Sequence, residues 1–228
     1  FNMLITCLRY FVEEVERLDQ SVLHDPDERF LHYMQRQPLG VVVGFLAWNF
    51  PLLNLGYKLG PSLASGCSCI LKPSELTPLA TLEVVALAQE AGIPDGVINV
   101  ITCKDHHVTD VLLKSDVPSL VTMIGSIRGG VEVMSAACTS VKQFSVELGG
   151  NSPVIVYPDA DVEMAAKKIV DLKYVNAGQV CVSPNRCFVH ESIYERFIEQ
   201  VLSVAENVSM GPMITDEARA RVLQHIED

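Results

Sequence analysis

Six short runs rich in β-branched and other apolar residues alternate along the chain with longer segments of helical periodicity. The runs expected to form strands are 40–46, 68–72, 97–102, 120–124, 152–156 and 186–189. The segments expected to form helices are 52–63, 78–91, 108–113, 130–140, 162–174 and 192–205. Because strands joined by crossover helices pair in parallel, this alternation predicts an α/β fold built on a parallel sheet.

Local residue choices mark the starts of two of these helices. Thr77 precedes Pro78, and threonine as N-cap with proline in the first helical position is a common helix start. Asp161 precedes the segment 162–174 in the same way. We therefore expect Thr77 and Asp161 to cap the helices that follow them.

The composition excludes several classes of partner. The 228 residues are 49% apolar, which is enough for a sizeable core. The 17 basic and 28 acidic residues give a net charge of −11, which argues against nucleic acid as a partner. The longest apolar run, 40–48, is shorter than the roughly 18 residues that span a bilayer, so no membrane partner is expected.

The seven cysteines are an odd number without a disulfide-like rhythm, which indicates a reducing compartment, the cytoplasm. Cys67 and Cys69 are separated by one residue, and this is not the C-x-x-C spacing of zinc or redox sites. We interpret them as packing residues and expect no metal site.

One cysteine has a different setting. Cys181 ends the run 176–181, Asn-Ala-Gly-Gln-Val-Cys, whose small Gly178 allows a tight approach of backbone to substrate. A thiolate is a strong nucleophile toward a carbonyl carbon. Taken alone, a cysteine in an apolar setting is more often a buried structural thiol, and this is the alternative for Cys181.

Two further residues suit the chemistry of a carbonyl. Glu147 ends a strand-like run before Gly149-Gly150, where partial desolvation would make its carboxylate a general base. Asn49 lies between Trp48 and the pair Phe50-Pro51, which stops the strand and aims an amide suited to an oxyanion. The ordinary alternatives are a solvated glutamate and a turn asparagine.

Two turns have the chemistry of a nucleotide site. Lys72 and Glu75 follow a buried strand, at the end where open α/β sheets bind nucleotides, although they are equally a surface pair. Gly125-Ser126 stands between a strand and a helix, a geometry that presents backbone N–H groups to a pyrophosphate. A plain strand-to-helix turn is the alternative for the second motif.

In this order, these motifs resemble those of the aldehyde dehydrogenase superfamily, from about Arg9 to the end of the chain. The resemblance implies a Rossmann-like, parallel-sheet NAD(P)-binding domain at 1–148 and the start of an α/β catalytic domain at 149–228. Segment 21–37 corresponds to a family hairpin used in oligomer contacts, which implies a homo-dimer or homo-tetramer. Glu147 favours the hydrolytic branch over the coenzyme-A-acylating branch.

The resemblance also implies a mechanism that oxidises an aldehyde to a carboxylic acid. Cys181 would attack the aldehyde to give a thiohemiacetal and then a thioester, and Glu147 would activate the hydrolytic water. Asn49 and the Cys181 N–H would form the oxyanion hole. Lys58 corresponds to a family lysine near the cofactor and the proton path.

The remaining contacts follow from the same resemblance. The positions that correspond to cofactor contacts are Leu46, Ala47, Trp48, Lys72, Ser74, Glu75, Gly125, Ser126, Gly130 and Leu148. The positions that correspond to the aldehyde tunnel are Phe50, Tyr57, Val180 and Val182. Glu75 would repel a 2′-phosphate, so NAD is favoured, while Ser74 leaves NADP as the alternative. The apolar tunnel residues favour a neutral aldehyde.

The chain departs from the family pattern in several places. The family's glycine-rich turn is replaced by 103–107, Cys-Lys-Asp-His-His, and Met123, Ile124 and Ile127 replace a phenylalanine and two threonines. Nothing matches the downstream Glu-x-Phe-Gly-Pro segment, so we expect the catalytic domain to be incomplete.

Two other interpretations stay open at this point. One is a truncated, non-catalytic remnant of the family. The other is a cysteine hydrolase that pairs Cys181 with His190 or His225.

Overall fold

The computed structural model describes residues 1–227, the side chain of His106 excepted. The chain divides into two compact units, Phe1–Leu148 and Gly149–Asp228. Their expected roles as cofactor domain and catalytic domain stay predictions. No helix within the described residues is both long and apolar enough to cross a bilayer.

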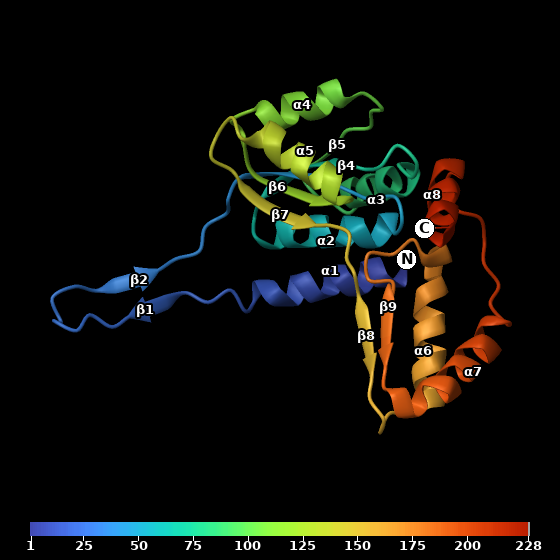
Figure 1. The fold of residues 1–228 in the computed structure, drawn as a ribbon. Helices are drawn as coiled ribbons and strands as arrows, with labels where there is room; N and C mark the ends of the chain where they lie inside the picture. The colour runs from blue at the N-terminus through green and yellow to red at the C-terminus, as the bar shows by residue number, and fades with distance from the viewer. Residues whose placement is uncertain (228) are drawn as a thin grey trace. The chain divides into compact units, whose positions relative to one another are not determined.

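A five-stranded parallel sheet forms the centre of the first unit (Figure 1). Its strands are β3 (Val41–Phe45), β4 (Ser68–Lys72), β5 (Ile98–Val100), β6 (Pro118–Ile124) and β7 (Gln143–Glu147), in the order β5-β4-β3-β6-β7. The predicted α/β fold with a parallel sheet is confirmed. Strand β7 was not among the expected strands.

Helices cover both faces of this sheet, and the alternation of side chains along β3 explains why. Val42 packs in a cluster with Leu55 and Leu59 of α2 (Pro51–Ala64), which α3 (Leu79–Glu90) also joins. Its neighbour Val43 belongs to a second cluster with residues of α4 (His106–Lys114) and α5 (Ile127–Ala137). Successive residues of a strand point to opposite faces, so both faces of β3 are apolar and buried.

Helix α1 (Asn2–Val15) packs closely against α2. A Cβ on Gly60 would lie 2.6 Å from the Phe11 ring, and a Cβ on Gly56 would lie 3.2 Å from Cys7. The two glycines of α2 therefore set how near the helices approach each other.

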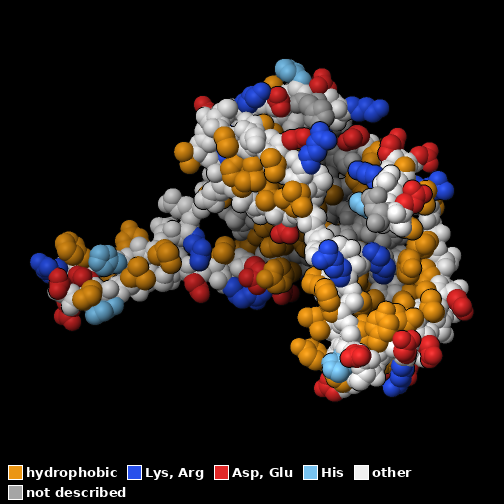
Figure 2. All heavy atoms as spheres, in the orientation of Figure 1, with side chains coloured by type: hydrophobic (Ala, Val, Ile, Leu, Met, Phe, Trp, Pro, Cys, Tyr) orange, Lys and Arg blue, Asp and Glu red, His pale blue; other side chains and the backbone are white. Residues whose placement is uncertain are grey.

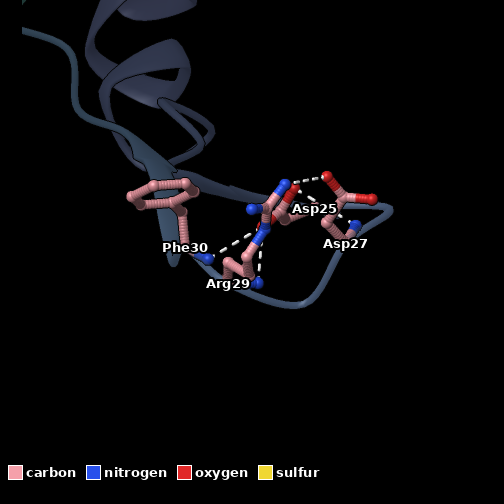
Figure 3. A network of polar contacts seen from close by, with 4 residues as sticks. All are labelled: Asp25, Asp27, Arg29 and Phe30. Carbon is pink, nitrogen blue, oxygen red and sulfur yellow. Dashed lines mark hydrogen bonds and ion pairs between the residues drawn. The ribbon is translucent and has the colours of Figure 1, made fainter.

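The segment after α1 forms an antiparallel hairpin of β1 (Ser21–Leu23) and β2 (His32–Met34), which projects from the sheet (Figure 1). Its loop is organised by Asp25, whose carboxylate accepts the N–H groups of Arg29 and Phe30, both at 2.8 Å (Figure 3). The hydrogen bond from Phe30, with that from Arg29, holds the pKa of Asp25 below its ordinary value. The expected oligomer contact through this hairpin stays a prediction.

The second unit is a β-α-β arrangement with further helices. Strands β8 (Pro153–Val156) and β9 (Arg186–Val189) pair in parallel across α6 (Val162–Tyr174), followed by α7 (Tyr194–Ala205) and α8 (Asp216–Glu227). Val156, Val162, Ala166 and Phe197 form its core. Asp161 caps α6 as predicted, accepting the Met164 N–H at 3.0 Å.

The predicted cap of α3 is wrong. Its N-cap residue is Pro78, which makes no side-chain cap bond, and the buried Thr77 hydroxyl has no hydrogen-bond partner within the described residues. The helix starts one residue later than expected, so the Thr77 side chain does not reach the free N–H groups of the first turn.

Candidate active site

The chain order of the strands reverses between β3 and β6. Strand β3 continues through α2 to β4 on one side, whereas β6 lies on its other side. The segment 46–49 follows β3, and Gly125-Ser126 follows β6. Because Phe45 pairs with Met123, the two strands end at the same level. In open parallel sheets, ligands bind in the crevice at this reversal, outside the carboxyl ends of the strands.

Strand β6 leads into a tight turn that starts α5. The Ser126 hydroxyl accepts the Gly129 N–H at 3.0 Å and so caps the helix. A Cβ on Gly130 would lie 2.8 Å from Leu148, so glycine lets Leu148 pack directly on the first turn of α5. Three predicted cofactor residues of this motif, Ser126, Gly130 and Leu148, thus lie around one helix start.

The predicted ribose-binding motif follows β4 at the same edge of the sheet. The Lys72 carbonyl accepts the Leu46 N–H at 3.0 Å, which ties the end of β4 to the end of β3. Ser74 turns the chain by accepting the Leu76 N–H on its hydroxyl at 3.3 Å. Glu75, the next residue, is exposed.

Asn49 is held by two donors. The Phe50 N–H donates to Asn49 Oδ1 at 3.1 Å, and Asn54 Nδ2 donates to the same oxygen at 3.2 Å. Asn54 Nδ2 also donates to the Ala47 carbonyl at 3.0 Å. Asn54 was not among the predicted site residues, although a polar residue on a buried helix face is itself a signal of a specific hydrogen bond.

Lys58 and Glu147 interact electrostatically at the same edge. Lys58 is only 5% exposed. Burial lowers its pKa, and the negative charge of Glu147 acts in the opposite direction. Glu147 ends β7 beside the turn after β6, where its carbonyl accepts the Gly125 N–H at 3.0 Å, and its side chain is exposed.

Cys181 belongs to the second unit and follows an unusual stretch of backbone. Asn176, Ala177 and Gly178 all have positive φ, at 51°, 56° and 75°. For alanine this conformation costs on the order of 1–3 kcal/mol, and such strain concentrates at functional sites. Gln179 braces the loop, because its Nε2 donates to the Asn176 carbonyl at 2.9 Å and its Oε1 accepts the Ile214 N–H at 3.0 Å. The Cys181 side chain is exposed.

Gly150, the second glycine after Glu147, lies close to the same loop. A Cβ on Gly150 would lie 2.8 Å from the Cys181 carbonyl oxygen. Two motifs that are distant in the sequence therefore meet within the second unit. The convergence of Cys181 with Asn49 and Glu147, which belong to the first unit, stays a prediction.

An apolar hollow of about 500 Å³ lies between α1 and α2. The residues that line it are Asn2, Met3, Thr6, Cys7, Tyr10, Phe11, Leu53 and Tyr57. None of these side chains bears a formal charge. Tyr57, a predicted substrate residue, belongs to this hollow, and Phe50 lies at the start of the same helix.

His190, one of the two histidines that a hydrolase would use, is already engaged. His190 Nδ1 accepts the Ser192 N–H at 3.2 Å and lies 3.0 Å from the Ser192 hydroxyl. This ring therefore caps the short helix Glu191–Ile193, which is an ordinary structural role. Within the described residues, no cluster of three or more His, Cys, Asp or Glu side chains is arranged to hold a metal ion.

Comparison with known proteins shows the family of the chain. A profile of the aldehyde dehydrogenase family matches residues 1–228. The chain is 40% identical over 233 residues to the mitochondrial succinate-semialdehyde dehydrogenase of Arabidopsis thaliana, covering 97% of the chain and 44% of that protein. It is 40% identical over 221 residues to the phenylacetaldehyde dehydrogenase of Pseudomonas fluorescens, covering 92% and 44%.

A solved structure agrees as well. PnpE in complex with nicotinamide adenine dinucleotide superposes with a TM-score of 0.93 at 34% identity, covering 99% of the chain and 48% of PnpE. The chain spans about half the length of the relatives that it matches.

Proposed function

Because the chain belongs to the aldehyde dehydrogenase family, we propose that it oxidises an aldehyde to a carboxylic acid with NAD(P). The observation that carries this proposal is the carboxyl edge of the first unit's sheet. There Asn49 follows β3, the buried Lys58 ammonium interacts electrostatically with Glu147, and Glu147 ends β7 beside the turn that starts α5. These are the groups that an acyl-transfer reaction on a carbonyl requires.

The first step uses Cys181 as nucleophile. Its sulfur forms a bond to the carbonyl carbon, and the carbonyl oxygen becomes an oxyanion in a thiohemiacetal. The Asn49 amide and the Cys181 N–H donate hydrogen bonds to this oxygen. A bound dinucleotide would supply the hydride acceptor for this adduct, whose collapse would leave a thioester on Cys181.

Hydrolysis of the thioester needs a base. Glu147 takes a proton from water, the hydroxide adds to the thioester carbon, and the carboxylic acid leaves as the Cys181 thiolate is released. The Lys58 ammonium, which interacts electrostatically with Glu147, lies at the same edge of the sheet.

The residues at the sheet edge fit a dinucleotide. The first turn of α5, capped by Ser126, presents N–H groups where a pyrophosphate would lie, beside the strand-order reversal. Lys72, Ser74 and Glu75 would hold the adenosine ribose, and an exposed Glu75 favours the 2′-hydroxyl of NAD. The positions that would complete the site are Leu46, Ala47, Trp48, Gly125, Gly130 and Leu148.

The hollow between α1 and α2 supports a neutral, apolar aldehyde as substrate. Its lining gives an aldehyde tail about 500 Å³ of apolar surroundings and no cation to pair with a carboxylate. Phenylacetaldehyde has these properties, whereas a semialdehyde bears a carboxylate at its far end. Tyr57 and Phe50 would contact the tail from α2, and Val180 and Val182 would contact it from the cysteine loop.

The projecting hairpin supports assembly into a homo-dimer or homo-tetramer. Apolar side chains lie exposed along it (Figure 2). The exposed apolar residues of this segment are Val22, Leu23, Phe30, Leu31, Tyr33 and Met34. A second copy of the chain would bury them. The seven free cysteines support the cytoplasm as the compartment.

An assay of NADH formation tests the proposed reaction. The protein that carries this chain is mixed with NAD or NADP and a panel of neutral and carboxylate-bearing aldehydes. We expect NADH only when both substrates are present, and faster with phenylacetaldehyde than with succinate semialdehyde. Dinucleotide binding without turnover would favour a non-catalytic remnant, and release of a carboxylic acid from an ester or amide without NAD(P) would favour a hydrolase.

A further inference from the structure

Asn54 bridges the end of strand β3 and the candidate oxyanion residue. It lies in the first turn and a half of α2 and is only 5% exposed. Its Nδ2 donates to the Ala47 carbonyl at 3.0 Å and to Asn49 Oδ1 at 3.2 Å. A side-chain NH2 group has two hydrogens, so it can make both bonds at once.

Two backbone groups fix which way these amides face. The Ala47 carbonyl only accepts hydrogen bonds, so the end of Asn54 that meets it must be the NH2 group. The Phe50 N–H only donates, so the end of Asn49 that meets it must be the oxygen. Asn54 then supplies the second donor to that oxygen.

Because Oδ1 of Asn49 is held, the position of the other end of its amide, Nδ2, is determined as well. If this amide were inverted, its NH2 group would face two donors, and the buried Asn54 amide would lose a partner. With Oδ1 turned to Asn54 and Phe50, Nδ2 is the end directed away from them. An oxyanion is stabilised by the N–H end of an amide and repelled by its oxygen.

We propose that Asn54 is a positioning residue that orients the Asn49 amide, so that Nδ2 rather than Oδ1 meets the oxyanion. This inference rests on the proposed function, in which Asn49 forms the oxyanion hole. Asn54 itself does not contact the substrate. Its contribution is a second donor beside the Phe50 N–H, which makes the inverted orientation of Asn49 less stable still.

Replacement of Asn54 with leucine tests the inference, because leucine keeps the size and removes both donors. We expect kcat to fall about 10-fold to 100-fold, somewhat less than the loss of an entire oxyanion donor. The KM for NAD should stay within about twofold, since the change acts on the transition state. The matched control is Asn99→Leu, because Asn99 Nδ2 likewise donates to two carbonyls, those of Cys69 and Gly96, without contacting Asn49.

A double-mutant cycle separates positioning from a general structural role. In an Asn49→Ala background, Asn54→Leu should change kcat by less than about twofold, because the amide that it orients is gone. The same loss of kcat in both backgrounds would overturn the proposal. So would a kcat of Asn54→Leu equal to that of the wild type. A wild-type protein that makes no NADH would instead reject the proposed function.

A second measurement needs no variant and covers the case in which Asn54→Leu does not fold. Neutron diffraction of the deuterated wild-type protein distinguishes the deuterated NH2 group from the oxygen in each side-chain amide. We expect the oxygen of Asn49 to face the deuterated NH2 group of Asn54. If the deuterated NH2 group of Asn49 faced Asn54 instead, the proposal would be overturned.

Discussion

Gly150 lies against the backbone of Cys181, so closely that a Cβ at Gly150 would be 2.8 Å from the Cys181 carbonyl oxygen. Its neighbour Gly149 has no atom within 4 Å of the corresponding position. The two glycines of this motif therefore differ in whether a side chain would fit. Only the second is required by the loop that presents the candidate nucleophile.

Gly150→Ala should therefore displace the Cys181 loop. We expect the melting temperature to fall, with a cost of about 1–3 kcal/mol typical of overpacking, and kcat to fall with it. Gly149→Ala is the matched control, because its added methyl group enters open space. Equal effects of the two substitutions on kcat would show that the approach of Gly150 to Cys181 does not matter for catalysis.

Cys181→Ala should abolish NADH formation and leave NAD affinity near that of the wild type, since the dinucleotide residues lie on the first unit. Isothermal titration measures the affinity, and absorbance measures turnover. The control is Cys138→Ala, which removes another exposed thiol. Residual turnover by Cys181→Ala above the assay background would remove Cys181 as the nucleophile.

Glu147→Gln should slow hydrolysis more than acylation, so an acyl group should accumulate on Cys181. General-base catalysis contributes roughly 10²-fold to 10⁴-fold, and the steady-state rate should fall within that range. Mass spectrometry of acid-quenched protein detects the thioester. Glu132→Gln, on the exposed face of α5, is the control. An unchanged rate without acyl-protein would reject Glu147 as the base.

Glu75→Ala should relax the preference for NAD over NADP. Removing a carboxylate next to the 2′ position should raise the NADP to NAD ratio of kcat/KM roughly tenfold, equivalent to about 1.4 kcal/mol. Glu83→Ala removes an exposed charge from α3 and serves as the control. If both variants keep the wild-type ratio, the motif after β4 does not select the cofactor.

The parts of the fold that were predictable from the sequence are those with strong local signals. Strand β4 and helix α6 have the predicted bounds, because a short apolar run and an Asp161 cap with helical periodicity mark them. Strand β7 was missed since it is an edge strand with alternating polar residues and little apolar length. Helix α8 is polar on most of its surface, so its periodicity was weak.

The candidate site was predictable only in part for the same physical reason. Motif order indicated Asn49, Glu147 and the nucleotide turns, and for Asn49 and the nucleotide turns a recognisable strand lies just before the motif. Asn54 and the approach of Gly150 to Cys181 depend on side-chain and backbone contacts that exist only after the chain folds. No spacing rule in the sequence predicts them.

Lys58 provides a test based on pH. Burial lowers its pKa below the ordinary value of 10.5, so the folded chain binds this proton more weakly than the unfolded chain does. Between the lowered pKa and 10.5 the unfolded state holds more protons, and the free energy of unfolding should rise with pH because of this residue. Below the lowered pKa, the full destabilisation is present.

Lys58→Met should remove that rise and increase stability near neutral pH relative to the alkaline range. Urea unfolding at a series of pH values measures the slope. The control is Lys114→Met, because Lys114 is exposed and pairs with Asp110 at 2.9 Å, so its loss should change stability little at any pH. If wild type and Lys58→Met show parallel stability curves, Lys58 is not held in a destabilising environment.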